Sequence, residues 1–194
     1  MFLSLFNSFV SVKAPPDIVG LQDPPVWGSR LPTFGGFTLL HAPTVGNRKP
    51  RVALYVSSAL WAYATILPLF FDCFDVAALD FHGSDLFVRI FPQFRILNVY
   101  NLRSNSVNCM TVSPVVSFPE IHFPLLVVGD FNIHHPLSDS LRAHSAEELN
   151  VSFPYFSRAA RMGYELLKTP RVFTWFPLGG NTCPSVIDLS FASP

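Results

Sequence analysis

A short apolar strand that runs directly into a polar cluster, at residues 123–136, constrains the fold of this chain most strongly. Leu125 to Val128 is a continuous apolar run, β-branched at its end, which is typical of a buried strand. In an extended backbone Asp130 and Asn132 would share one face, while Phe131 would point to the other. The stretch therefore predicts a buried strand that carries a carboxylate and an amide together at its tip.

Two interpretations of this polar tip are open from the residues alone. A carboxylate can bind a hard cation or accept a proton from water, and an amide can hold a phosphoryl oxygen. Asp and Asn after a strand are, however, more often turn residues that satisfy nearby backbone groups. The residues Gly129-Asp130-Phe131-Asn132 alone favour the turn interpretation, so the functional interpretation requires further polar residues at the same place.

Composition predicts one globular domain that spans residues 1–194. The chain is 49% hydrophobic and 13% charged, which indicates a large buried core rather than disorder. Its 13 Lys and Arg residues balance 13 Asp and Glu residues, so any binding of nucleic acid must come from local geometry. The densest basic patch is residues 47–51, which predicts a solvated loop or, alternatively, a loop that steers phosphate.

Cysteine usage and the apolar segments predict an intracellular protein, nuclear or cytoplasmic, with no membrane association. Cys73, Cys109 and Cys183 are far apart and form no C-x-x-C motif, which argues against both a disulfide framework and a zinc knuckle. Met1 to Val12 lacks the basic region of a secretory signal. Ala59 to Phe71 is too short for a membrane span and is interrupted by a proline.

Periodicity and capping signals predict a mixed α/β chain. Ser145 and Glu148 form a capping-box pattern that predicts a helix start, and Gly163 predicts the end of a second helix. The predicted helices are Ala59 to Ile66, Val107 to Val116, one from Ser145, and Pro154 to Met162. The predicted strands are residues 17–22, 37–41, 52–57, 74–80, 86–91, 94–100, 125–128, 166–168, 172–176 and 184–191.

Several motifs follow one another along the chain in an order that resembles the order of motifs in a known family. Gly129-Asp130-Phe131-Asn132-Ile133-His134-His135-Pro136 resembles the core motif of the endonuclease/exonuclease/phosphatase family and, more narrowly, the endonuclease domain of fungal non-LTR retrotransposons. Further matches, in chain order, are Gln22-Asp23-Pro24, Asn98-Val99-Tyr100-Asn101, Thr174-Trp175 and Ser185-Val186-Ile187-Asp188. The resemblance covers residues 17–194.

The resemblance implies an α/β fold in which two mixed β-sheets pack face to face with outer helices, a four-layer α/β sandwich. It also implies Mg²⁺-assisted (or Mn²⁺-assisted) hydrolysis of a DNA phosphodiester, a nick that would prime reverse transcription in the parent element. Asp23 would hold the metal in place of the family's Glu. The other implied site residues are catalytic Asp130, Asn132, Tyr100 and Asp188, and substrate-binding Asn101, Thr174, His134 and His135.

The sequence departs from the family pattern at both ends, so we expect a fold that is incomplete at the termini and an impaired activity. The family's Ser-Asp-His strand tip has no counterpart after Asp188, and Asn7 is the one candidate for the metal-site Asn of the first strand. Residues 8–17 leave little room for the helix that follows that strand. Three alternatives remain: a phosphatase of the same fold, a catalytically inactive nucleic-acid-binding remnant, and a pseudogene product that does not fold.

Overall fold

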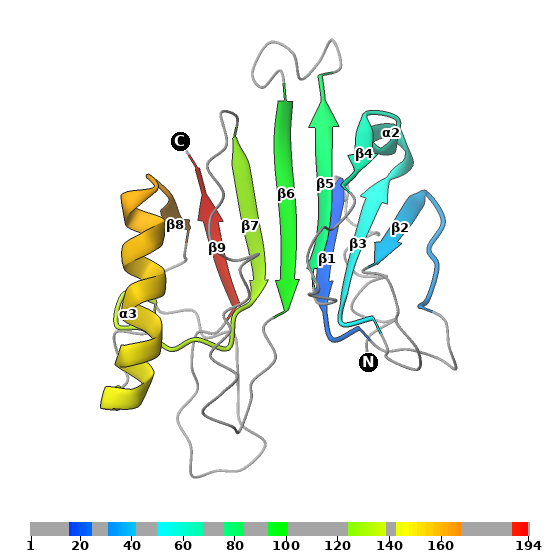
Figure 1. The fold of residues 1–194 in the computed structure, drawn as a ribbon. Coiled ribbons are helices and arrows are strands. Elements are labelled where there is room, and N and C mark those ends of the chain that lie inside the picture. Colours follow the sequence, from blue (N-terminus) through cyan, green and yellow to red (C-terminus); the bar gives the residue numbers. More distant parts are fainter. Residues whose placement is uncertain are drawn as a thin grey trace.

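The described part of the chain forms two β-sheets and one long helix (Figure 1). The computed structural model describes residues 16–24, 31–41, 50–67, 76–83, 93–100, 124–138, 143–167 and 188–193. The strands are β1 (Ile18–Gln22), β2 (Phe37–His41), β3 (Val52–Ser57), β4 (Ala64–Ile66), β5 (Val76–His82), β6 (Gln93–Tyr100), β7 (Leu125–Asp130), β8 (Glu165–Leu167) and β9 (Asp188–Ala192). The helices are α2 (Ser58–Trp61) and α3 (Ala146–Arg161).

The two sheets pack face to face, which confirms the predicted fold class (Figure 1). The smaller sheet has the order β1-β3-β2 and is antiparallel, whereas the larger one, β4-β5-β6-β7-β9-β8, is mixed because β6 and β7 run parallel. Between them lies an apolar core that includes Leu54, Val56, Leu79, Phe81 and Ile96. Side chains alternate between the faces of a strand, so every second residue of β5 and β6 enters this core.

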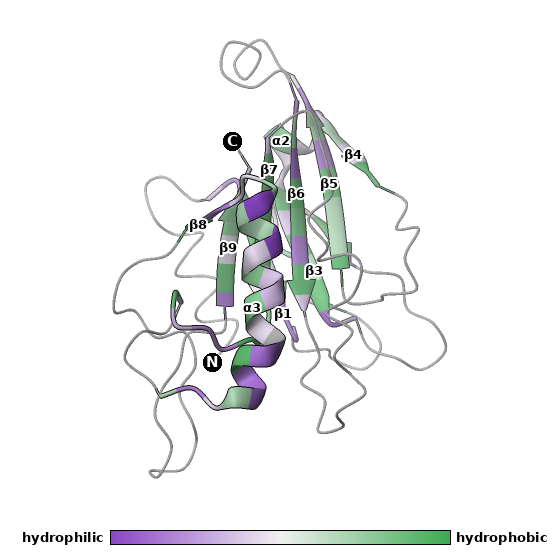
Figure 2. Ribbon diagram, turned by 60° about the vertical axis from the view of Figure 1, so that its left-hand side comes forward, coloured by the Kyte–Doolittle hydropathy of each residue, from purple (hydrophilic) through white to green (hydrophobic). Residues whose placement is uncertain are grey.

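Helix α3 packs on the outer face of the larger sheet at its β8–β9 end (Figure 1). Tyr155, Phe156 and Ala159 of this helix pack on Phe131 and Phe191, and the rings of Phe156 and Phe191 lie 5.6 Å apart. Figure 2 shows hydrophilic residues on the side of the helix that faces away from the sheet. The helix is thus amphipathic, and no helix in the described ranges has the length and apolar character to cross a membrane.

The outer face of the smaller sheet is covered by a loop in the described structure, not by the helix layer that the sandwich prediction placed there. Tyr55 lies on this face and packs against Phe34, with ring centroids 5.2 Å apart. Its hydroxyl donates to the carbonyl oxygen of Pro32 at 2.7 Å. The described residues therefore form three layers plus this loop.

Helix α3 begins at the predicted cap and ends just before Gly163, as predicted, but it is one helix and not two. Ser145 caps it, and the capping box with Glu148 is formed in both directions. The predicted break before Pro154 is wrong, because one helix runs from Ala146 to Arg161 with the proline inside. Proline costs a helix one backbone hydrogen bond. The aromatic residues that follow it are buried in the core, and this packing keeps the helix continuous.

The predicted helix at Ala59–Ile66 is also wrong in its second half. Helix α2 ends at Trp61, and Ala64–Ile66 forms β4, which pairs with β5 in antiparallel register. Strand pairing at the edge of the larger sheet outweighs the weak helix preference of these residues. The strands predicted at 17–22, 37–41, 52–57, 74–80, 94–100 and 125–128 correspond to β1, β2, β3, β5, β6 and β7. The elements predicted at 86–91, 107–116 and 172–176 lie outside the described residues.

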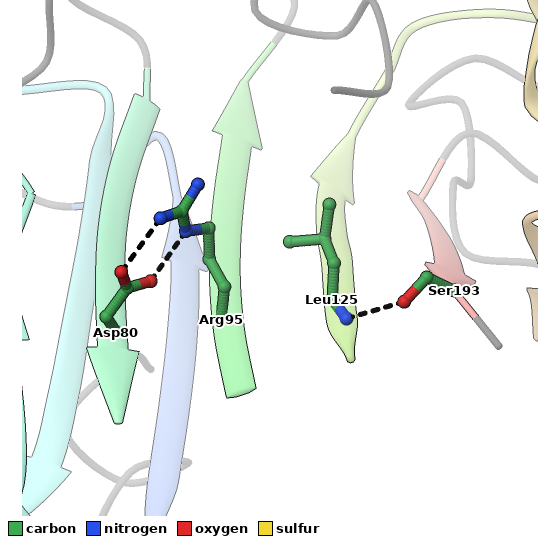
Figure 3. Close-up of polar contacts among 4 residues, drawn as sticks. All are labelled: Asp80, Arg95, Leu125 and Ser193. Carbon is green, nitrogen blue, oxygen red and sulfur yellow. Dashed lines mark hydrogen bonds and ion pairs between the residues drawn. The ribbon is translucent and has the colours of Figure 1, made fainter. Parts of the chain in front are cut away.

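Polar contacts fix the register of the larger sheet (Figure 3). Asp80 of β5 and Arg95 of β6 are cross-strand partners, and the guanidinium donates to both carboxylate oxygens, at 2.5 and 2.8 Å. The backbone N–H of Leu125 donates to the hydroxyl of Ser193 at 2.7 Å, which joins the start of β7 to the end of β9. These contacts hold the neighbouring strands in the alignment on which the site depends.

Candidate active site

Three of the predicted catalytic residues form one row across the larger sheet. Tyr100 at the end of β6 is in register with Asp130 at the end of β7, and Asp130 is in register with Asp188 at the start of β9. Residues in register on neighbouring strands point to the same face. Their neighbours Val99 and Leu189 enter the core under α3, so the row lies on the opposite face, toward the smaller sheet.

Asp130 lies in surroundings that favour its protonated form. The pKa of this carboxyl is raised to about 6, chiefly by burial and in smaller part by the negative charges of Asp188 and Asp23, while hydrogen bonds from the backbone and side chain of Asn132 oppose the shift. A carboxylate with a pKa in this range can accept a proton near neutral pH. The position is therefore electrostatically suited to a general base.

The backbone turns after Asp130 instead of continuing as an extended strand. Asn132 has a φ of 48°, in the left-handed region, and its backbone N–H donates to the Asp130 carboxylate at 2.9 Å. The extended backbone assumed through Asn132 is therefore wrong, because this local hydrogen bond forms a turn that Asn tolerates. Phe131 is fully buried in the core under α3, on the side away from Asp130, as predicted.

Gly129 permits the close approach of β6 and β7 beside the row. A Cβ at this position would lie 1.9 Å from the backbone oxygen of Val99, far inside any permitted contact. Val99 and Gly129 are register partners, one position before Tyr100 and Asp130. The glycine is thus required for the strand alignment that brings the tyrosine and the carboxylate together.

Asp23 is connected to this row through Arg51, for which the sequence predicts only a place in a basic loop. The Asp23 carboxylate lies 3.2 Å from Arg51 Nε, and its side chain is 68% exposed. Arg51 Nη2 donates to the hydroxyl of Tyr100 at 2.6 Å, and the guanidinium carbon lies 4.3 Å from the centre of that ring. Burial raises the pKa of Tyr100, and the positive charge of Arg51 opposes this shift.

Asn98 joins the two sheets directly behind the site. Its side chain is fully buried, and Nδ2 donates to the carbonyl oxygens of Leu21 at 3.1 Å and Ala53 at 2.9 Å. Its Oδ1 accepts from Gln22 Nε2. The amide thus satisfies three groups of the smaller sheet at once, next to Asp23, and holds β1 and β3 over β6.

The two adjacent histidines lie in different surroundings. His135 is 3% exposed, its ring stacks on Phe156 at 4.0 Å, and its Nδ1 accepts from the backbone N–H of Leu137 at 3.1 Å. Burial lowers the pKa of this imidazole. His134 is partly exposed. The remaining predicted contacts, Asn101 and Thr174, lie outside the described residues.

A hollow of about 650 Å³ lies between the sheets beside the row. Gln22, Gly129 and Asp188 are among its lining residues, as are the apolar Ile96, Leu126 and Val128. The hollow therefore reaches the row at Asp188.

The donor types at this site fit a hard divalent cation. Asp23, Asp130 and Asp188 supply carboxylate oxygens. Burial is the main cause of the raised pKa of Asp130, and the negative charges of Asp188 and Asp23, which a cation would offset, add to it. The described residues contain no group of three or more His, Cys, Asp or Glu side chains that could hold a metal. Mg²⁺ usually needs only one or two carboxylates, because it keeps several waters and also binds substrate phosphates.

Comparison with solved structures identifies the fold, although no family model and no curated protein matches the sequence. The endonuclease domain of TRAS1, a telomere-specific non-LTR retrotransposon, is similar with a TM-score of 0.61 and 13% identity, over 91% of this chain and 73% of that domain. The catalytic domain of APE2 from Xenopus laevis also has a TM-score of 0.61, with 12% identity, over 97% of this chain and 77% of that one. The chain therefore shares the α/β sandwich fold of these two domains, which is the fold that the motifs predict.

Proposed function

We propose that this chain hydrolyses a phosphodiester bond of DNA with Mg²⁺ or Mn²⁺ as cofactor. The observation that carries the proposal is the row formed by Tyr100, Asp130 and Asp188, with the Asp130 carboxyl at a pKa of about 6. Hydrolysis needs a base for the attacking water and donors for the phosphoryl oxygens. The row offers both kinds of group on one face of the sheet. Action on DNA would place the protein in the nucleus or cytoplasm.

Asp130 would orient the attacking water and take its proton at the carboxylate. The buried position and the neighbouring charge of Asp188 make this carboxylate more basic than an exposed one. Asn132 keeps the carboxylate oriented, because its backbone N–H donates to it. In this assignment Asp188 supports the base and does not contact the water.

Tyr100 and Asn132 would bind the phosphoryl oxygens. The Tyr100 oxygen accepts a hydrogen bond from Arg51, so its own O–H remains available as a donor. The Asn132 side-chain amide carries two N–H donors, so it would supply a second donor in addition to its hydrogen bond with Asp130. Asn101, Thr174, His134 and His135 stay predicted substrate contacts.

Asp23 would hold the metal, because its exposed carboxylate lies at the open side of the site. Bound there, the cation supplies charge neutralisation for the phosphoryl oxygens and the leaving group. Asp is one methylene shorter than the Glu of the resembled motif, so we expect weaker metal binding than Glu would give. The substitution Asp23→Glu should lower the Mg²⁺ concentration that half-saturates the activity.

Nicking of supercoiled plasmid tests the proposal. Asp130→Asn keeps the acceptor oxygen for the Asn132 N–H but removes the base, so the nicking rate should fall by about 10²-fold or more. Glu165→Gln is the matched control, because it makes the same change on an exposed residue of β8, at the far edge of the larger sheet. A wild-type rate in Asp130→Asn would refute the assignment. DNA binding without any nicking would instead indicate a binding remnant, and turnover of a small phosphate ester alone would indicate a phosphatase.

A further inference from the structure

Arg51 makes two contacts of different kind at the edge of the site. Its Nη2 donates to the Tyr100 hydroxyl at 2.6 Å, and its guanidinium lies over the Tyr100 ring at 4.3 Å. Its Nε lies 3.2 Å from the Asp23 carboxylate but is buried and makes no hydrogen bond. The guanidinium is therefore anchored to Tyr100 by a hydrogen bond and to Asp23 by charge alone.

The difference between the two contacts determines which one breaks when a metal ion binds at Asp23. The Asp23 side chain is 68% exposed, so solvent screens its attraction to Arg51. The Tyr100 contact combines a short hydrogen bond with a cation–π contact, and it does not depend on the carboxylate. A divalent ion on Asp23 would repel the guanidinium from that side and leave the contact with Tyr100 in place.

We propose that Arg51 is a positioning residue of this site, which holds Tyr100 in place and competes with the metal ion for Asp23. The inference rests on the proposed function for the identity of the metal ligand. Arg51 would then have two effects of opposite sign on the site. Its guanidinium weakens metal binding, and it orients the Tyr100 hydroxyl that would donate a hydrogen bond to the phosphate. Before metal binds, it also neutralises the Asp23 carboxylate beside the other negative charges of the site.

Metal binding in the absence of DNA tests the competition. In Arg51→Gln the carboxylate loses its competitor, so the Mn²⁺ dissociation constant measured by electron paramagnetic resonance should fall about two- to five-fold, the size expected for a partly exposed ion pair. Arg161→Gln on α3 removes the same charge from the opposite side of the larger sheet and should leave the constant unchanged. When Asp23→Asn is combined with Arg51→Gln, the gain in Mn²⁺ affinity should disappear. Unchanged Mn²⁺ affinity in folded Arg51→Gln would overturn the proposal.

A measurement on the unaltered protein covers the case in which Arg51→Gln does not fold. During a Mg²⁺ titration the Arg51 Nε–H nuclear magnetic resonance signal should shift, because the ion pair with Asp23 opens, while the Arg161 signal stays constant. An Arg51 signal that does not respond at saturating Mg²⁺ would also overturn the competition.

Nicking kinetics test the positioning of Tyr100 separately. At saturating Mg²⁺, kcat should fall in Arg51→Gln and fall less in Arg51→Lys, which keeps a donor but not the planar fork. Equal kcat in all three proteins would refute the positioning effect. If Arg51→Gln tightens Mn²⁺ binding but the wild type nicks no DNA, the proposed function is refuted while the competition between Arg51 and the metal is supported.

Discussion

Asp130 and Asp188 are direct partners across the antiparallel pair of β7 and β9, so two carboxylates share one face of the larger sheet. Two like charges at neighbouring positions disfavour ionisation of both groups. Burial is the larger cause at Asp130, and with the charge of Asp188 it raises the pKa from 3.8 to about 6. Ionised Asp130 thus costs stability at neutral pH, and the same two effects make this carboxylate basic.

We predict that Asp130→Asn stabilises the fold above pH 6. The folded pKa lies above the unfolded one, so the favourable contribution of the protonated carboxyl is complete below pH 3.8 and is lost as the pH rises through about 6. At pH 8 the amide should therefore raise the free energy of unfolding by about 1 to 2 kcal/mol, after allowance for solvent screening. Urea unfolding at several pH values measures this.

The same experiment carries its own internal control. The gain from Asp130→Asn should shrink to near zero well below pH 3.8, where the wild-type carboxyl is largely protonated in both states. Glu165→Gln on exposed β8 should produce no such pH-dependent gain. A stability difference that is equal at acid and neutral pH would contradict the raised pKa.

Nicking activity should rise as the pH passes through about 6, because Asp130 must be ionised to accept a proton. Asp188→Asn removes one of the charges that raise this pKa, so the midpoint of the profile should move to lower pH. The maximal rate should fall as well, since a less basic carboxylate is a weaker base. Rate profiles from pH 5 to 9 on plasmid DNA would test both effects, and an unchanged midpoint in Asp188→Asn would exclude the coupling.

Gly129→Ala should destabilise the fold strongly and disrupt the site. The new methyl group would meet the Val99 carbonyl oxygen at 1.9 Å, so β6 and β7 would have to separate. Overpacking of this kind costs about 1 to 3 kcal/mol and more where backbone cannot move. Gly35→Ala is the matched control, because a Cβ at Gly35 meets no atom within 4 Å. Equal melting temperatures of the two variants would contradict the close strand approach.

The sequence predicts much of the fold because its strongest signals are local ones. The strand at Leu125–Asp130 and the capping box at Ser145 follow from apolar runs and capping chemistry within a few residues. The errors fall where packing over a distance decides the outcome. Ala64–Ile66 joins β5 as a strand, and Pro154 is tolerated because α3 buries the aromatic residues that follow it, Tyr155 and Phe156.

The candidate site is partly predictable for the same reason. The motifs identify Tyr100, Asp130 and Asp188, but their common row depends on strand register, which no short motif contains. Arg51 could not be assigned from the sequence, since its partners are 28 and 49 positions away along the chain. Long-range pairs of this kind become visible only once the order of the strands is known.

Asn98 gives the last prediction, because its buried amide connects both sheets beside the site. Asn98→Ala would leave the carbonyl oxygens of Leu21 and Ala53 and the amide of Gln22 without their partner. Each buried group left unsatisfied costs about 1 to 3 kcal/mol. Leu21 and Gln22 are only partly buried, so we expect a total loss of about 2 to 4 kcal/mol in the free energy of unfolding. Guanidinium unfolding measures the loss.

The control for this prediction is Asn150→Ala on the exposed side of α3, where the change should stay within about 0.5 kcal/mol. Asn98→Ala should also lower nicking, because Asn98 lies two residues before Tyr100 on the same strand face and fixes β1, which leads to Asp23. Nearly equal stability of Asn98→Ala and Asn150→Ala would mean that the Asn98 amide does not hold the two sheets together. Other contacts between the sheets would then have to keep Asp23 and Tyr100 close to each other.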